Sequence, residues 1–505
     1  MNQLKAGVAL NYIVIILNML VGLLYTPYML RMMGQSEYGL YSLVASVISY
    51  LTVLDLGMGN AIVRYTAKFR AEGKTTEQYE MFGMFLILYL IIGVIAFMLG
   101  LGLYFNVDTL FGASMTVEEL DKARLMMLFL IFNLAVTFPM SIFGSITTAY
   151  EHFVFPKVVN IIRIFLNTTI MICLLKMGYK AVAMVVLQTI FNLMTLLINY
   201  IYCKHKLKIK ILFNKFKWGF LKEVAIYSFW IFLNVIMDRI YWNTGQFILG
   251  AFVGTAAVAV FAVAINLEHI YMQFSTAITG AFLPKITALV AKNNNSKEIS
   301  DLFIRTGRIQ YIVIAMILTG FIAFGRDFIK LWAGPEYESA YPITILFFFS
   351  LAIPLIQNLG ITILQARNQM RFRSLLYIII ASCSLVSQIL LAKPYGGLGC
   401  AIAIAGALFL GQGLIMNIYY QKKQHLDVIS FWKEILKMSV VPFIICLFSL
   451  YILQNVVFDG WLSFGIAIII FMLVYIPLFY HFSMNKSEKE LFLKPIITLL
   501  HKINQ

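Results

Sequence analysis

Residues 82–104 read FGMFLILYLIIGVIAFMLGLGLY and contain no charged side chain. This run is longer than the ~20 apolar residues that a helix needs to cross a bilayer, and similar runs recur along the chain. Of the 505 residues, 61% are hydrophobic and 12% are charged, against about 45–50% and about 25% in soluble globular proteins. The sequence therefore predicts an all-α, polytopic membrane protein. Continuous apolar runs of this length disfavour a transmembrane barrel, whose strands are short and alternate in polarity.

The apolar runs predict about fourteen transmembrane helices, which places both termini on the same side of the membrane. The expected spans are 6–30, 40–63, 82–104, 125–149, 156–175, 181–203, 224–249, 251–279, 309–332, 341–365, 374–392, 397–420, 438–455 and 461–482. Thirty of the 39 Lys and Arg residues fall on the side that holds the termini. Because cytoplasmic loops carry the excess of basic residues, we expect a multi-pass membrane protein with cytoplasmic termini. The same bias explains the net charge of +16, so no nucleic-acid partner is expected.

The chain repeats itself with an offset of about 220 residues, aligning 34–41 with 254–261 and 64–67 with 285–288. Each copy holds six spans, so the copies have the same orientation. Parallel repeats of this kind are typical of transporters, with the solute site between the lobes. We therefore expect two pseudo-symmetric six-helix lobes plus two peripheral helices. The expected segments are an N-lobe (1–203), a cytoplasmic linker (204–222), a C-lobe (223–421), the last two spans (422–482) and a cytoplasmic tail (483–505). In the tail, Ser487 and Glu490 form a capping-box pattern that predicts a short interfacial helix.

Two stretches carry a family resemblance. Residues 25–41 (YTPYMLRMMGQSEYGLY) and 54–65 (LDLGMGNAIVRY) resemble the first hairpin and the end of the second span in Wzx-type flippases. These are the O-antigen, capsule and exopolysaccharide flippases of the polysaccharide transporter family, in the MOP (MATE-like) superfamily.

The resemblance implies that the protein moves an undecaprenyl-pyrophosphate-linked oligosaccharide from the cytoplasmic to the outer face by alternating access. It implies a location in the bacterial inner (plasma) membrane and a role in polysaccharide biosynthesis, such as that of lipopolysaccharide. Its expected partners are the lipid-linked oligosaccharide, membrane lipids and other polysaccharide-assembly membrane proteins.

Charged groups inside spans cost about 2.5–3.5 kcal/mol each to insert, so they are the first functional candidates. We expect arginines to bind the pyrophosphate or an acidic sugar, because a guanidinium offers a bidentate set of donors. Polar neighbours at helical spacing would complete this substrate site. The candidates for substrate binding are Arg64, Arg163, Arg239, Asn18, Asn234 and Tyr241. The alternative for the arginines is that they only reach toward lipid headgroups.

The candidates for ion coupling are Asp238 and Glu268. Either would bind H⁺ or Na⁺, and no other cofactor is expected. The alternatives are that the polar face of Asp238 only packs helices, and that Glu268 only hydrogen-bonds His269. Asp55 precedes Gly57 and Gly59, and it favours local bonding or capping over a functional role.

Three other functions remain as alternatives. A MATE-type drug or cation antiporter of the same fold would favour an acidic cavity, whereas here the spans hold three acids and three arginines. A lipid II-type flippase would share the fold. A membrane glycosyltransferase would need sizeable outer loops, and the longest, 106–122, has 17 residues. No Walker A or hydrolase motif occurs in the sequence, so we expect no enzyme activity.

Overall fold

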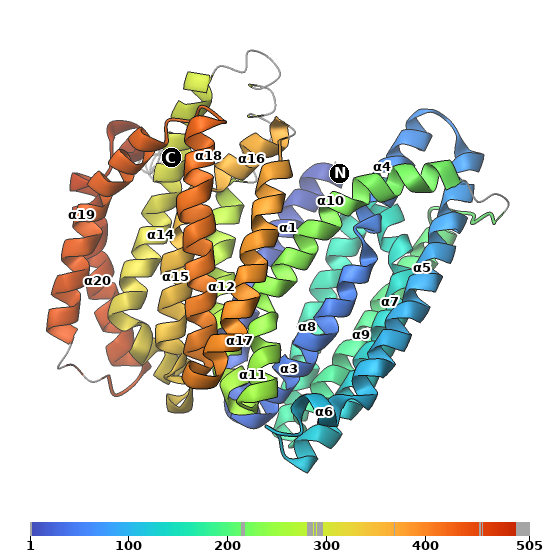
Figure 1. The fold of residues 1–505 in the computed structure, drawn as a ribbon, viewed down its shortest axis with the longest axis horizontal. Coiled ribbons are helices and arrows are strands. Elements are labelled where there is room, and N and C mark those ends of the chain that lie inside the picture. The colour runs from blue at the N-terminus through green and yellow to red at the C-terminus, as the bar shows by residue number, and fades with distance from the viewer. Residues whose placement is uncertain are drawn as a thin grey trace, which may run out of the picture. The chain divides into compact units, whose positions relative to one another are not determined.

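The computed structural model describes residues 3–490 except 214–217, 280–285, 287–288, 290–295, 368, 454–455 and 457. The described residues form helices joined by short connections, without a strand (Figure 1), which confirms the all-α class. They contain eleven helices long and apolar enough to cross a membrane, or twelve if one bent pair counts as a single span. Most of the tail, 491–505, lies outside the described residues, as does 214–217 of the linker.

The helices up to residue 252 are α1 (Gln3–Leu20), α2 (Thr26–Met33), α3 (Gln35–Leu51), α4 (Met58–Ala71), α5 (Thr75–Phe105), α6 (Val107–Phe111), α7 (Val117–Ala149), α8 (Val154–Lys176), α9 (Ala181–His205), α10 (Trp218–Trp242) and α11 (Thr244–Phe252). A π-helix, η1 (Val21–Tyr25), joins α1 to α2, and a 3₁₀ turn, η2 (Thr52–Asp55), follows α3.

The later helices are α12 (Thr255–Thr279), α14 (Ser296–Trp332), α15 (Ala340–Ile356), α16 (Asn358–Ala366), α17 (Arg371–Leu408), α18 (Met416–Lys422), α19 (Val428–Leu453) and α20 (Trp461–Phe482). The 3₁₀ turn η3 (Pro335–Tyr337) precedes α15, and the π-helix η4 (Phe409–Ile415) joins α17 to α18.

The difference between eleven or twelve spans and the expected fourteen arises partly at α17. The stretch Arg371–Lys422 counts as one span of 52 residues, which as a straight helix would measure about 78 Å. The hydrocarbon core is about 30 Å thick. Gly396 interrupts α17 with φ 55° and ψ −136°, so the run divides there into the expected eleventh and twelfth spans.

The chain forms two compact units. Unit 1 holds Met1–Ala262 with Leu385–Cys400, and unit 2 holds Val263–Ser384 with Ala401–Gln505. Packing defines these units, whereas a sequence repeat defines the expected lobes, so the lobe boundaries stay a prediction.

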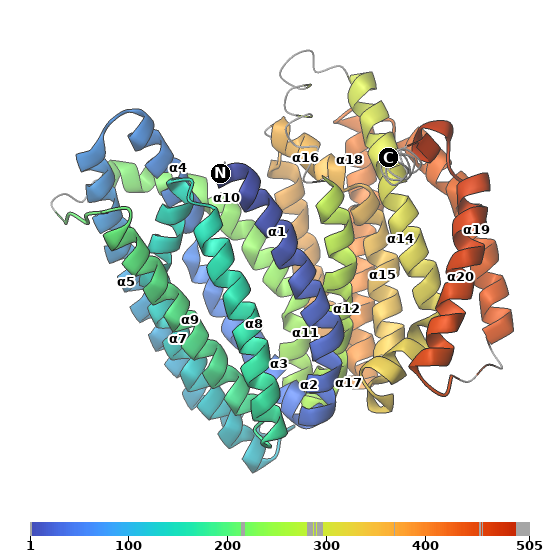
Figure 2. The same ribbon diagram turned by 180° about the vertical axis from the view of Figure 1, so that it is seen from behind.

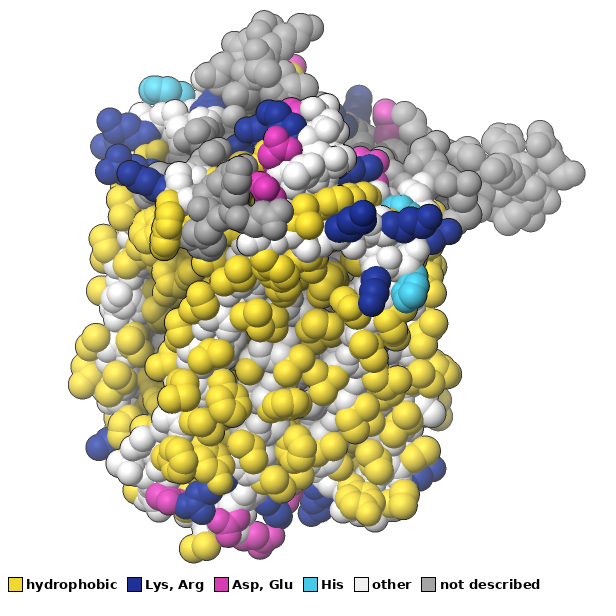
Figure 3. All heavy atoms as spheres, turned by 90° about the vertical axis from the view of Figure 1, so that its right-hand side faces the viewer, with side chains coloured by type: hydrophobic (Ala, Val, Ile, Leu, Met, Phe, Trp, Pro, Cys, Tyr) yellow, Lys and Arg dark blue, Asp and Glu magenta, His cyan; other side chains and the backbone are white. Residues whose placement is uncertain are grey.

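Unit 1 is built around α7, which packs against α3, α4, α5 and α9. Small residues let α5 come close to α7: a Cβ added to Gly93 would lie 2.8 Å from the Ala135 carbonyl oxygen. Small residues at helical spacing are the usual means of close helix packing in membranes. On the face shown in Figure 3, hydrophobic side chains form a broad band and charged side chains gather beyond its two ends. This is the pattern of a surface that faces lipid.

The turn between α2 and α3 lies inside the stretch that resembles the flippase hairpin. Gly34 has φ 79°, a left-handed conformation that glycine adopts without strain. Glu37 is buried, and it accepts hydrogen bonds from Lys122 Nζ at 2.6 Å and from the Ala181 N–H at 3.3 Å. It therefore ties α3 to α7 and α9, so part of this motif serves the fold.

In unit 2, an ion network joins the last two spans to α14. Arg308 on α14 is 5% exposed. Its Nε and Nη2 donate to the two oxygens of Glu488 at 2.6 and 2.9 Å, and its Nη1 donates to Glu434 on α19 at 2.6 Å. The helices expected to be peripheral are thus bonded to unit 2 by a buried cation.

The same segment corrects one sequence expectation. Residues 486–490 are helical, but the cap is Asn485 with Glu488 rather than Ser487 with Glu490. The Glu488 N–H donates to Asn485 Oδ1 at 2.9 Å, and the Asn485 N–H donates to Glu488 Oε2 at 2.9 Å. Glu488 also binds Arg308, and this tertiary contact is consistent with the helix beginning two residues earlier than local sequence suggested.

Candidate functional site

A row of polar side chains follows α8 from its first turn to its middle. Its members, the α8 polar stripe, are Lys157, Asn160, Arg163 and Asn167, and all four are half-buried. Spacings of three and four residues place them on one side of the helix. They extend over about 15 Å at about 1.5 Å per residue, which is about half of the ~30 Å hydrocarbon core.

The opposite side of α8 is apolar and exposed. It carries Val158, Ile162, Phe165 and Leu166, which are 39%, 52%, 67% and 42% exposed. At about 100° per residue, the centre of this side lies about 170° from that of the stripe. The lipid-facing side and the polar side of α8 are therefore distinct, and the stripe does not face hydrocarbon.

The stripe is partly bonded and partly open. Lys157 Nζ donates to Asn11 Oδ1 on α1 at 2.6 Å, and Arg163 Nη2 donates to Asn160 Oδ1 at 2.7 Å. Asn167 Oδ1 is buried and accepts no hydrogen bond from the described residues. Buried polar groups usually have partners, so this amide is a group that a ligand or water can satisfy.

Helix α1 packs along α8 (Figure 2) and carries two further polar residues, Asn11 and Asn18. Asn18 lies seven residues after Asn11 and is exposed. Two turns of helix bring these residues to the same side. The structure therefore places two of the predicted site residues, Asn18 and Arg163, on neighbouring helices of unit 1.

Arg64 lies elsewhere in unit 1, on α4. Its side chain is exposed, and its guanidinium carbon is 5.6 Å from the centre of the Tyr65 ring. The nearby break between α3 and α4 is stabilised by Asp55, which accepts a hydrogen bond from Tyr89 Oη at 2.8 Å and from the N–H groups of Gly57 and Gly59. This confirms the local bonding expected of Asp55.

The predicted residues of α10 have different surroundings. Asp238 is exposed and Arg239 is half-buried, whereas Tyr241 is only 2% exposed. Arg239 Nε is buried and has no acceptor among the described residues. The side chain of Asn234 lies outside the described part of the structure.

Glu268 lies on α12 in unit 2 and is fully buried. Neither carboxyl oxygen accepts a hydrogen bond from the described residues, although His269 Nδ1 lies 3.3 Å from Oε2. A buried carboxylate without donors is unfavourable in a low dielectric. This carboxyl therefore needs a proton, a cation or the His269 side chain to be stable.

Sequence reasoning missed the two asparagines of the stripe, and it did not name Lys157 as a candidate although the expected span 156–175 contains this residue. It considered polar residues at helical spacing in the stretch 234–241 but not in the stretch 157–167. The sequence VFPKVVNIIRIFLN at 154–167 holds the signal, because its polar residues recur at intervals of three and four.

The described residues form a polytopic helical fold with a polar stripe on α8. Two solved structures have similar folds. A lipid II flippase, MurJ, in an inward closed conformation has a TM-score of 0.69 and 18% identity, covering 97% of this chain and 99% of its own. An inward-facing multidrug resistance MATE transporter of the MOP superfamily has a TM-score of 0.61 and 14% identity, covering 77% and 96%. The fold is therefore similar to those of these two membrane proteins.

The sequence model of the polysaccharide biosynthesis protein family matches residues 4–290, more than half of the chain, and the chain belongs to this family. A relative from Bacillus subtilis (strain 168), described as the uncharacterized membrane protein EpsK, is 20% identical over 512 residues, covering 96% of both chains. The family resemblance found in the first hairpin is thereby confirmed.

Proposed function

We propose that this protein flips an undecaprenyl-pyrophosphate-linked oligosaccharide from the cytoplasmic to the outer face of the bacterial inner membrane by alternating access. The observation that carries the proposal is the α8 polar stripe. It sets two cations and two amides along about 15 Å of one side of a helix, in a member of the polysaccharide biosynthesis protein family.

The stripe lowers the main barrier to flipping. A sugar pyrophosphate that crosses hydrocarbon unaided loses its hydrogen bonds to water, which costs several kcal/mol for each polar group. Lys157 and Arg163 supply positive charge for the pyrophosphate, and the guanidinium adds paired donors. Asn160, Asn167 and Asn18 supply amides for sugar hydroxyls. The polyprenyl chain is apolar and stays in the bilayer.

The composition of the stripe distinguishes this function from a drug or cation antiporter of the same fold. A cationic substrate needs carboxylates in its path, whereas the stripe contains none. The cationic stripe therefore supports an anionic headgroup as substrate. An anionic pyrophosphate headgroup is compatible with the biosynthesis of O-antigen, capsule or exopolysaccharide.

Energy for the cycle would come from an ion gradient, the membrane potential or removal of product. Glu268 is the better placed of the two predicted coupling acids, because it is buried without hydrogen-bond donors among the described residues while Asp238 is exposed. We propose that Glu268 binds H⁺ or Na⁺ during the cycle.

The test is headgroup translocation in liposomes that contain the purified full chain. Arg163→Ala should reduce the rate at least tenfold, since a lost hydrogen bond to a charged group is worth about 1.5–3 kcal/mol. Asn167→Ala should reduce it about two- to tenfold, since a hydrogen bond between neutral groups is worth about 0.5–1.5 kcal/mol. Arg163→Lys should restore part of the rate. Arg326→Ala is the control, because Arg326 is an exposed cation outside the stripe with 63% side-chain exposure.

Wild-type rates in both stripe variants would refute the role of the stripe. For coupling, Glu268→Gln should retain translocation but lose its response to a proton or sodium gradient. An unchanged gradient response in this variant would exclude Glu268 as the coupling residue.

A further inference from the structure

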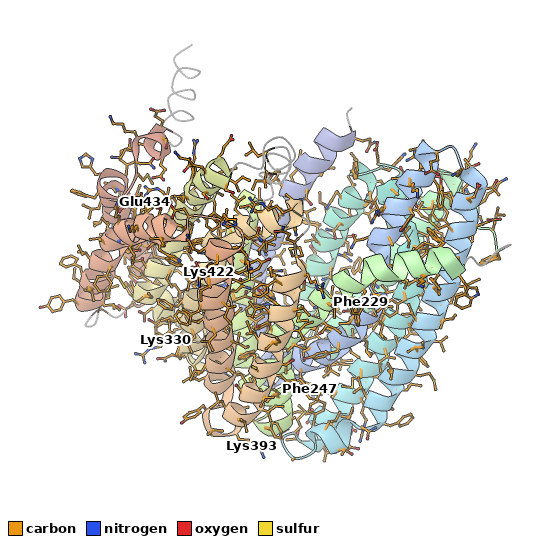
Figure 4. All side chains as sticks on the ribbon, turned by 45° about the horizontal axis from the view of Figure 1, so that its top comes forward. Phe229, Phe247, Lys330, Lys393, Lys422 and Glu434 are labelled. Carbon is orange, nitrogen blue, oxygen red and sulfur yellow. The ribbon has the colours of Figure 1, made fainter. Side chains whose placement is uncertain are left out.

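Unit 2 contains a groove between α18 and α19, with a cavity volume of about 460 Å³. We call it the α18–α19 groove. Its walls include Ile418 and Lys422 on α18 and Ile429, Trp432, Lys433 and Leu436 on α19. On α19 these residues recur at three-, four- and seven-residue intervals, so they lie along one side of the helix. Figure 4 shows Lys422 and Glu434 from this part of the unit.

The base of the groove is held by a buried amide. Asn417 Nδ2 donates to the carbonyl oxygens of Gln412 and Gly413, both at 2.9 Å. These carbonyls belong to η4, where a π-turn alters the regular helix bonding. Asn417 Oδ1 accepts from Gln357 Nε2 at 2.7 Å and from Trp432 Nε1 at 2.8 Å. The groove is therefore a preorganised feature, because the indole on its wall is bonded to its base.

Two lysines, Lys422 and Lys433, supply positive charge at the groove. Both are exposed, and within the part of the chain that the structure describes neither forms an ion pair within 4 Å. Glu434 already binds Arg308 Nη1 at 2.6 Å and Lys437 Nζ at 2.8 Å, whereas Asp427, just before α19, interacts electrostatically with Lys433 and offsets part of its charge. The groove thus combines apolar walls with two exposed lysines.

We propose that the α18–α19 groove binds an anionic phospholipid of the surrounding bilayer. The phosphate lies between Lys422 and Lys433, and one acyl chain covers Ile418, Ile429 and Leu436. A soluble phosphate would leave the apolar walls in contact with water, and a zwitterionic lipid would bring its own cation toward the lysines. Neither matches the groove as well as an anionic lipid does. The site is separate from the α8 polar stripe and does not depend on the proposed transport function.

The experiment measures quenching of tryptophan fluorescence in the purified full chain by phosphatidylglycerol with brominated acyl chains. Comparing Trp432→Phe with the wild type isolates the signal of the groove from the other tryptophans. The double variant Lys422→Gln/Lys433→Gln should weaken binding about 30-fold. Each lysine near a lipid surface contributes about 1 kcal/mol, and about 1.4 kcal/mol corresponds to a tenfold change in Kd. Each single variant should weaken binding about fivefold.

The matched control is Lys423→Gln/Lys437→Gln, which removes the same charge at the same ends of these helices but outside the groove. It should change binding less than threefold. Equal quenching by brominated phosphatidylcholine, or equal loss of binding in the control, would overturn the proposal. Displacement of the phospholipid by glycerol phosphate alone would show an anion site without a lipid chain. Stronger displacement by undecaprenyl phosphate would assign the groove to the transported lipid. Either displacement result would refute the proposal.

Discussion

Arg308→Met is expected to destabilise unit 2 more than the removal of an exposed charged side chain does. Arg308 is 5% exposed and donates three hydrogen bonds to carboxylates and a fourth to the Ser483 carbonyl at 3.2 Å. The Glu488 side chain is itself 2% exposed. Removing the guanidinium leaves a carboxylate buried without its counter-ion.

The magnitude follows from this geometry. Breaking a buried ion pair by removing one partner costs about 3–5 kcal/mol, since the remaining charge stays desolvated. Glu434 contributes less, because its side chain is 34% exposed and water can replace its partner. At about 2 °C or more per kcal/mol, the loss corresponds to a fall in Tm of at least about 6 °C. Replacing both partners, as in Arg308→Met/Glu488→Leu, removes the unpaired charge and should recover much of this loss.

The assay is thermal unfolding of the detergent-solubilised full chain, followed by the loss of monomeric protein on size exclusion after heating. Arg326→Met is the matched control. Its pair with Glu338 is exposed at 63% and 31%, so the expected cost is about 0–1 kcal/mol. If Arg308→Met and Arg326→Met lower Tm equally, the buried network does not hold the last two spans to α14 and the reasoning is wrong.

Three further outcomes are expected. Gly39→Ala should lower Tm, because a Cβ at this position would lie 1.9 Å from the Thr255 carbonyl oxygen. In the control, Gly102→Ala, the added Cβ meets nothing within 4 Å, so the variant should be neutral or stabilised by up to about 1 kcal/mol. Equal changes in Tm for the two variants would contradict the close packing at Gly39. Tyr89→Phe removes the 2.8 Å bond to Asp55 and should cost about 1.5–3 kcal/mol in thermal unfolding, whereas a cost below about 0.5 kcal/mol would mean that the backbone N–H groups of Gly57 and Gly59 suffice. Lys208→Cys lies in the predicted cytoplasmic linker and is exposed, so an impermeant thiol reagent should label it only after permeabilisation; labelling in intact cells would reverse the topology.

The helical class and most of the membrane-spanning segments could be predicted from the apolar pattern of the sequence. Apolar runs such as 82–104 specify a helix locally, because in lipid each backbone group must bond within its own segment. The 52-residue stretch from Arg371 to Lys422 was divided correctly at Gly396, since a glycine and bilayer thickness both limit span length. The resemblance of 25–41 and 54–65 to a flippase family was also readable, and the match over 4–290 confirms it.

The contacts between polar groups could not be predicted in this way, because they depend on how distant helices pack. Arg308 and Glu488 are 180 residues apart, and Lys157 and Asn11 are 146 apart. Reasoning from sequence placed Arg308 in a loop and Glu488 in the tail, because a charged residue near the end of an apolar run has the same local pattern whether it is buried or solvated. The partners depend on which helices pack together, and helix packing is set by many weak contacts at long range rather than by any one segment. The helices and the family can therefore be predicted from sequence. Which polar residues bond to one another depends on the packing of α1 on α8 and of α14 on α19.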